Sequence, residues 1–141
     1  MHLSLKMKIV LLGSGQGSTI RAICNAVKYN ILNVHISCIL ANKETTISSI
    51  ADEFNIPYIN SIWNKDDYSR DEYEILINEK LKTYSPDLVV FAGWDFIVSK
   101  TFISSFKKII NLHPALPNTF VGLNCIKEAY NAFQKGEIKY T

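Results

Sequence analysis

The strongest constraint on the fold of this chain is the alternation of short apolar segments with longer segments of helical periodicity. Segments with the character of buried strands occur at residues 7–12, 34–40, 57–59, 88–92 and 108–113. The residues between them show the three- or four-residue spacing of amphipathic helices. Strands that are apolar on both faces and alternate with helices form parallel sheets covered on both sides. We therefore predict an α/β fold with a doubly wound, mostly parallel sheet and helices on both faces.

The expected helices have recognisable boundaries. Residues 18–28 follow a glycine-rich turn, with Ser18 as a possible cap, and residues 68–83 stop before Ser85-Pro86-Asp87. Two further helices should present one apolar face each, formed by Ile47, Ile50, Ala51 and Phe54 and by Ile126, Ala129, Tyr130 and Phe133. Gly136 fits the end of the last helix, and residues 136–141 lead towards a further strand. We predict one domain over residues 1–141, with residues 1–6 as an extension.

Composition excludes several classes of protein. Hydrophobic residues make up 48% and charged residues 20%, and the formal net charge of +2 does not favour nucleic acid as the main partner. No apolar run reaches the roughly 18 residues that a membrane span needs. Three cysteines, far apart and odd in number, indicate neither a disulfide framework nor a zinc site. We expect a cytoplasmic protein with buried or half-buried thiols, no metal and no membrane partner.

The first candidate site is the turn Gly13–Thr19 (GSGQGST), between the first strand and the first helix. Glycines allow a tight turn and close approach of a ligand, while a helix amino terminus offers free N–H groups to a phosphate. The spacing of these glycines differs from that of a dinucleotide-binding turn. The sequence also lacks the Gly-Lys-Ser/Thr motif of a nucleoside triphosphate site. The alternative is that these glycines only turn the chain.

The second candidate is the segment 111–117 (NLHPALP), at the end of the fifth apolar segment. Asn111 and His113 are two residues apart, so that in a strand they point to the same face. An amide donor beside an imidazole can stabilise a developing oxyanion and move a proton. A structural role for His113 is the alternative, and we interpret His2 and His35 as structural or solvated.

The third candidate is the segment 92–98 (AGWDFIV), after the fourth apolar segment. Gly93 permits close backbone approach, and the large side chains that follow could line a slot for a flat heterocycle. Ordinary core packing of Trp94, Phe96 and Ile97 explains these residues equally well.

Charged residues near these segments are expected to be solvated. We expect Asp95 to face solvent, and we interpret the charged run Lys65–Glu74 as the exposed start of a helix. Within that run, Arg70 is the residue that could reach an anion.

Taken together, the glycine turn, the AGW segment at 92–94 and the NLHPALP segment resemble the folate-dependent N-formyltransferases, in particular the phosphoribosylglycinamide formyltransferases. The resemblance extends over the chain from Met7 and includes the ANK turn at Ala41–Lys43. It implies a formyltransferase Rossmann-like domain. It also implies that the catalytic aspartate of the family follows a further strand beyond Thr141, so that the carboxy-terminal part of the domain is lacking here.

The resemblance implies transfer of a formyl group from the co-substrate 10-formyltetrahydrofolate to the amine of glycinamide ribonucleotide, in de novo purine biosynthesis and without a metal. The residues that would bind the substrate phosphate are Gly17, Ser18 and Thr19. The catalytic residues would be Asn111 and His113. The residues that would bind the folate are Arg70, Phe96, Ile97, Val98 and Asn111.

Two departures and two alternatives accompany this interpretation. Thr19 stands where the family often has Asn, and Asp95-Phe96 replaces a pair that commonly includes Arg. A sugar-amine N-formyltransferase shares the Asn, the His and the donor. A shortened paralogue would bind a phosphate ligand without turnover. As partners we expect the small-molecule substrate and no nucleic acid, with the chain a monomer or a homodimer.

Overall fold

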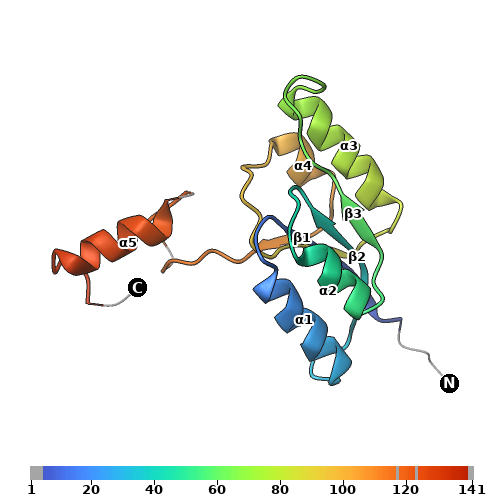
Figure 1. The fold of residues 1–141 in the computed structure, drawn as a ribbon, viewed down its shortest axis with the longest axis horizontal. Coiled ribbons are helices and arrows are strands. Elements are labelled where there is room, and N and C mark those ends of the chain that lie inside the picture. Colours follow the sequence, from blue (N-terminus) through green and yellow to red (C-terminus); the bar gives the residue numbers. More distant parts are fainter. Residues whose placement is uncertain (1–4, 117, 123, 140–141) are drawn as a thin grey trace. The chain divides into compact units, whose positions relative to one another are not determined.

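The computed structural model describes residues 5–116, 118–122 and 124–139, and within these ranges it holds five strands and five helices (Figure 1). Residues 1–4 of the expected extension, Pro117, Tyr140 and Thr141 lie outside the described residues. The chain divides into two compact units, Met1–Asn111 and Leu112–Thr141. A single domain over residues 1–141 stays a prediction.

The first unit is built on a parallel sheet, as predicted. Its strands are β1 (Met7–Gly13), β2 (Val34–Ala41), β3 (Tyr58–Asn60), β4 (Leu88–Phe91) and β5 (Ile109–Asn111). Their order in the sheet is β3-β2-β1-β4-β5, and each neighbouring pair is parallel. The chain moves outward from β1 to β3 and then returns to the other side of β1 with β4. The strand order therefore reverses between β1 and β4, which is where open parallel sheets bind ligands.

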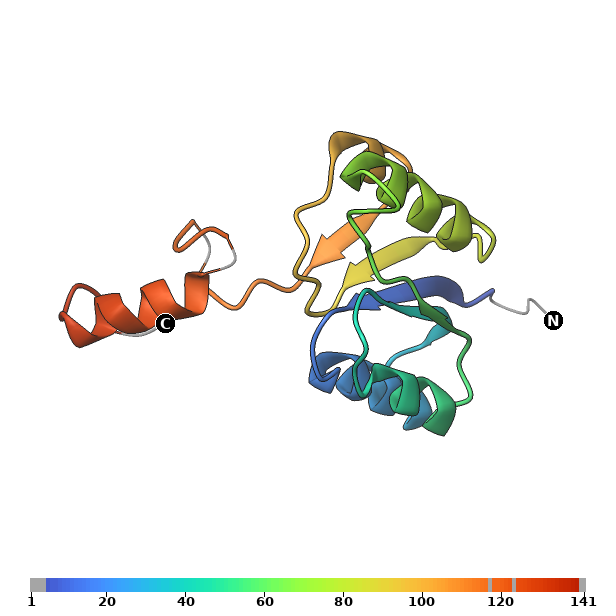
Figure 2. The same cartoon turned by 45° about the horizontal axis from the view of Figure 1, so that its top comes forward.

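Helices cover both faces of this sheet. In the first unit they are α1 (Ser18–Lys28), α2 (Ile47–Glu53), α3 (Arg70–Lys82) and α4 (Lys100–Ser104). Figure 2 shows α1 and α2 on one face and α3 and α4 on the other. The predicted bounds of α1 are confirmed, whereas α4 was not predicted.

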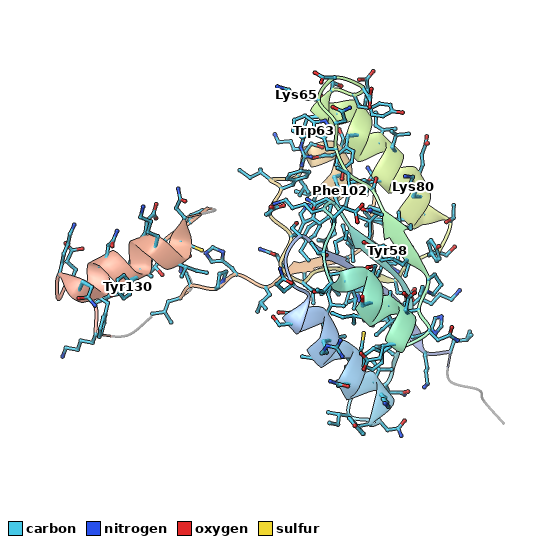
Figure 3. The ribbon with its side chains drawn as sticks, viewed as in Figure 1. Tyr58, Trp63, Lys65, Lys80, Phe102 and Tyr130 are labelled. Atoms are coloured by element: carbon cyan, nitrogen blue, oxygen red, sulfur yellow. The ribbon has the colours of Figure 1, made fainter. Side chains whose placement is uncertain are left out.

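Two layers of apolar side chains separate the sheet from its helices. Along β1, Ile9 and Leu11 pack with α1 and α2, while Val10 and Leu12 pack with α3 and α4. Successive side chains of a strand point to opposite faces, so that a strand buried on both sides must be apolar throughout. Phe102, labelled in Figure 3, is fully buried between α4 and the sheet.

The three cysteines are free and buried, as expected. Burial raises the pKa of Cys24 to about 11 and the pKa of Cys38 to about 12. Both thiols therefore stay protonated near neutral pH and serve as small apolar side chains.

The second unit contains α5 (Cys125–Gln134). Gly136 ends this helix in the left-handed conformation, with φ 72°, and the amides of Gly136 and Glu137 donate to the carbonyl oxygens of Phe133 and Ala132 at 3.0 and 2.9 Å. This pair of bonds is a Schellman motif and confirms the predicted helix end. Of the four residues expected on its apolar face, Ala129 is buried and the others are exposed, namely Ile126, Tyr130 and Phe133.

Candidate active site

The three candidate segments follow β1, β4 and β5. These strands are parallel neighbours in the order β1-β4-β5, so that their carboxyl ends lie at the same edge of the sheet. The glycine turn follows β1 and the 92–98 segment follows β4, on the two sides of the point where the strand order reverses. The sheet therefore brings two of the predicted segments to the position that ligands occupy in this kind of fold.

The amino end of α1 is open. Its cap is Gly17, at φ 78° and with no side-chain hydrogen bond, and Ser18 is the first helical residue rather than the cap. The first amides of a helix have no partner within it, so the amides at the start of α1 point outward with the positive end of the helix dipole. Ser18 is exposed and Thr19 is half-buried. This arrangement suits a phosphate.

The glycine turn is held in place from two sides. The Ser14 amide donates to the carbonyl oxygen of Gly93 at 2.9 Å, and the Thr46 hydroxyl donates to the carbonyl oxygen of Gln16 at 2.8 Å. A Cβ atom on Gly17 would lie 2.7 Å from Cδ1 of Ile50. Glycine is therefore required at this position by conformation and by space.

Asp95 differs from the expectation that it faces solvent. Its carboxylate accepts a hydrogen bond from Nδ2 of Asn42 at 2.9 Å and forms an ion pair with Lys43, and its amide donates to Oγ of Ser14 at 2.9 Å. Burial alone would raise the pKa of Asp95, but hydrogen bonds from Lys43, Ser14 and Asn42 and the charge of Lys43 hold this pKa below its ordinary value. The carboxylate therefore stays charged and joins the loop after β4 to the turn after β2, while the Asp95 amide joins it to the turn after β1.

Arg70 lies against the segment that was predicted to bind folate. Its guanidinium carbon is 3.8 Å from the ring centroid of Phe96 and 5.4 Å from those of Trp63 and Tyr73. Its Nη2 donates to the carbonyl oxygen of Ile97 at 3.4 Å. Nη1 is buried and has no hydrogen-bond partner among the described residues. Arg70 is thus a neighbour of residues 96–98 and not a solvated charge.

The predicted folate segment carries both buried and exposed side chains. Phe96 joins an aromatic cluster, 5.7 Å from Trp94 and 6.0 Å from Tyr73 between ring centroids, whereas Ile97 is 80% exposed. Trp63, labelled in Figure 3 near the amino end of α3, completes the cluster. Core packing thus accounts for Trp94 and Phe96 but not for Ile97. Val98 is half-buried.

The two predicted catalytic residues belong to different units. Asn111 is the last residue of β5, exposed and paired with Phe91 of β4. His113 is exposed in the second unit, where Nε2 lies 3.1 Å from the carbonyl oxygen of Phe120. A carbonyl oxygen only accepts, so Nε2 carries a proton in this contact.

Sequence reasoning missed some residues that shape this edge of the sheet. The charged run Lys65–Glu74 predicts a solvated side chain at Glu74, yet Glu74 is 3% exposed and accepts hydrogen bonds from Ser99. Neither residue lies in a recognised motif. The sequence does offer one signal for Ser99, because a serine three residues before an apolar residue such as Phe102 is typical of a helix cap. Ser99 indeed caps α4 by accepting a hydrogen bond from the Phe102 amide.

Within residues 5–116, 118–122 and 124–139, no group of three or more His, Cys, Asp or Glu side chains is placed to hold a metal ion. Over the same part of the chain, no helix combines the length and hydropathy that crossing a membrane requires.

An open parallel sheet with a glycine turn at the reversal of strand order defines the Rossmann-like class of α/β proteins. Residues 7–137 match the model of the formyl transferase family, and the chain belongs to this family. The match covers nearly the whole chain and includes each candidate segment.

Individual relatives agree with this placement. Phosphoribosylglycinamide formyltransferase of Dictyostelium discoideum is 32% identical, over 97% of this chain and 73% of the relative. The enzyme of that name from Schizosaccharomyces pombe is 33% identical, over 94% and 70%. A solved phosphoribosylglycinamide formyltransferase from Coxiella burnetii, in complex with CHES, has a TM-score of 0.82 and 28% identity, over 93% of this chain and 61% of that one.

Proposed function

We propose that this protein transfers a formyl group from 10-formyltetrahydrofolate to the amine of glycinamide ribonucleotide, a step of de novo purine biosynthesis. The observation that carries the proposal is the meeting of the open α1 amino end with the loop after β4, joined through Ser14. Membership of the formyl transferase family and relatives named for this reaction support it.

In this proposal the glycine turn binds the acceptor. The substrate phosphate accepts hydrogen bonds from the amides of Gly17, Ser18 and Thr19 and from the two hydroxyl groups, and the helix dipole favours its charge. The folate lies along Phe96, Ile97 and Val98, with Arg70 beside them. Glycinamide ribonucleotide and folate would thus occupy neighbouring loops at the edge where β1 and β4 end.

The chemistry needs a hydrogen-bond donor and a group that moves a proton. When the acceptor amine attacks the formyl carbon, a C–N bond forms and negative charge develops on the formyl oxygen. Asn111 donates to that oxygen through its amide. His113 helps a proton move from the attacking nitrogen to the folate nitrogen as the bond between the formyl carbon and that nitrogen breaks. These steps require no metal.

The test is a direct assay of the purified chain. With glycinamide ribonucleotide and 10-formyltetrahydrofolate, a chain that holds the full catalytic set should release tetrahydrofolate in proportion to the formylated product. Failure to bind either substrate would contradict the proposal. Binding of both without release of tetrahydrofolate would favour the non-catalytic paralogue, and equal use of a nucleotide-sugar amine would favour the sugar-amine alternative.

We further propose that the protein works in the cytoplasm, as a monomer or a homodimer and without a nucleic-acid partner. Light scattering coupled to size-exclusion chromatography tests the oligomeric state, because a mass above that of a dimer would contradict it.

A further inference from the structure

Glu74 is a charged side chain that lies inside the first unit. It is 3% exposed and accepts a hydrogen bond from the Ser99 amide at 3.0 Å and another from the Ser99 hydroxyl. Removing a carboxylate from water is costly unless it is paired and hydrogen-bonded. Because both donors belong to Ser99, the contacts that make this burial tolerable also fix the backbone at the end of the 92–98 segment.

Arg70 adds a second contact from the same helix. It lies one turn before Glu74, with Nη2 3.6 Å from Oε1 of that carboxylate. The same Nη2 donates to the Ile97 carbonyl oxygen at 3.4 Å, and the guanidinium covers the Phe96 ring. The carboxylate therefore holds Ser99 directly and acts on Ile97 through the arginine.

We infer that Glu74 is a positioning residue that fixes the backbone of residues 96–98 for folate binding. This inference rests on the proposed function. The structure describes residues 94–99 without helix or strand, so regular hydrogen bonds of a sheet or helix do not hold them. A segment ordered by Glu74 before the ligand arrives spares the binding step the cost of ordering it. In metal sites, residues that hydrogen-bond the metal ligands without touching the metal have comparable effects on affinity.

The test compares two substitutions in one helix. Glu74→Gln keeps the size of the side chain and an acceptor oxygen but removes the charge that Arg70 and Ser99 meet. Glu79→Gln makes the same chemical change at an exposed position of α3 and serves as the control. Calorimetry on the full chain would measure the dissociation constants of tetrahydrofolate and of glycinamide ribonucleotide separately. Amide hydrogen exchange at Ile97, Val98 and Ser99 reports on the segment without any ligand.

For Glu74→Gln we expect a folate dissociation constant raised about tenfold, the effect of weakening hydrogen bonds to a charged group. We expect unchanged affinity for glycinamide ribonucleotide and faster amide exchange at residues 97–99. Glu79→Gln should change none of these. If Glu74 had only a structural role, the substitution would instead lower the affinity for both ligands together.

Each contrary outcome has a distinct meaning. If the unsubstituted chain binds folate and Glu74→Gln binds it equally well, the inference is overturned and the proposed function stands. If the unsubstituted chain binds no folate, both are overturned. If Glu74→Gln does not fold, Ser99→Ala, which keeps the amide donor but loses the hydroxyl, must show the same selective loss of folate affinity. Equal loss for both ligands in that variant overturns the inference.

Discussion

Nδ2 of Asn42 donates a hydrogen bond of 2.9 Å to the carboxylate of Asp95, joining the turn after β2 to the loop after β4. Since β1 lies between these strands, the bond crosses the carboxyl end of β1. The Asp95 amide binds Ser14 at that end. Three loops at the candidate site are therefore linked through Asp95.

Asp95→Asn should lower the free energy of unfolding at neutral pH. It should also make that free energy fall less steeply as the pH is lowered. The pKa of Asp95 lies below its ordinary value of 3.8, so its contribution is present above that value and is lost as the pH falls through the lowered pKa. Urea unfolding of both proteins between about pH 7 and pH 3 measures this. The difference between their midpoints should shrink below about pH 4, and a constant difference would contradict the assignment.

Gly17→Ala should destabilise the first unit by about 1–2 kcal/mol, the cost of a left-handed conformation for a residue with a Cβ. The φ of 78° sets that cost, and contacts of 2.7 and 2.8 Å with Ile50 and Ile47 add to it. Gly15→Ala is the matched control, because its Cβ would meet nothing within 4 Å. Denaturant midpoints for the two variants decide the point, and equal midpoints would contradict it.

Ser18→Ala combined with Thr19→Ala should raise the KM for glycinamide ribonucleotide by about tenfold, because two hydroxyl donors to the phosphate are lost. The kcat should fall less, since these groups bind the phosphate equally in the ground and transition states. Steady-state kinetics separate the two, with Ser49→Ala at an exposed position of α2 as the control. A larger loss in kcat than in KM would place these residues elsewhere in the mechanism.

Asn111→Ala should slow turnover by about 100- to 1000-fold, as for loss of an oxyanion donor. Single-turnover rates measure this effect.

His113→Ala should slow turnover by about 100-fold or more with little loss of stability, because His113 is exposed. Single-turnover rates and thermal unfolding measure both effects. A near-normal rate in the histidine variant would remove His113 from the proposed mechanism.

Much of the fold could be predicted because its signals are local. The run at β1 is apolar because both faces are buried, and the bounds of α1 follow from its apolar period. Helix α4 could not be predicted, since it spans five residues and buries only Phe102 among them. Strand β5 covers Ile109–Asn111 rather than residues 108–113, and it pairs with Val89–Phe91 of β4 over this length.

The candidate site was less predictable where it depends on distant residues. The glycine turn could be located because its residue types report directly on backbone conformation. The partners of Asp95 could not, because Asn42 and Lys43 are more than fifty positions away in sequence and meet it only through the strand order. The prediction that Glu74 is solvated is wrong for the same reason, since its partner Ser99 lies at the start of α4 and not on α3.

The stacking of Arg70 on Phe96 has a consequence for the thermodynamics of association. A long, flexible side chain loses up to about 2 kcal/mol of rotamer entropy when it is immobilised. In this protein the rings of Phe96, Trp63 and Tyr73 restrict the guanidinium in the absence of any ligand. Most of that entropic cost is therefore incurred when the chain folds, and under the proposed function an anionic ligand that binds Arg70 would meet a charge whose motion is already restricted.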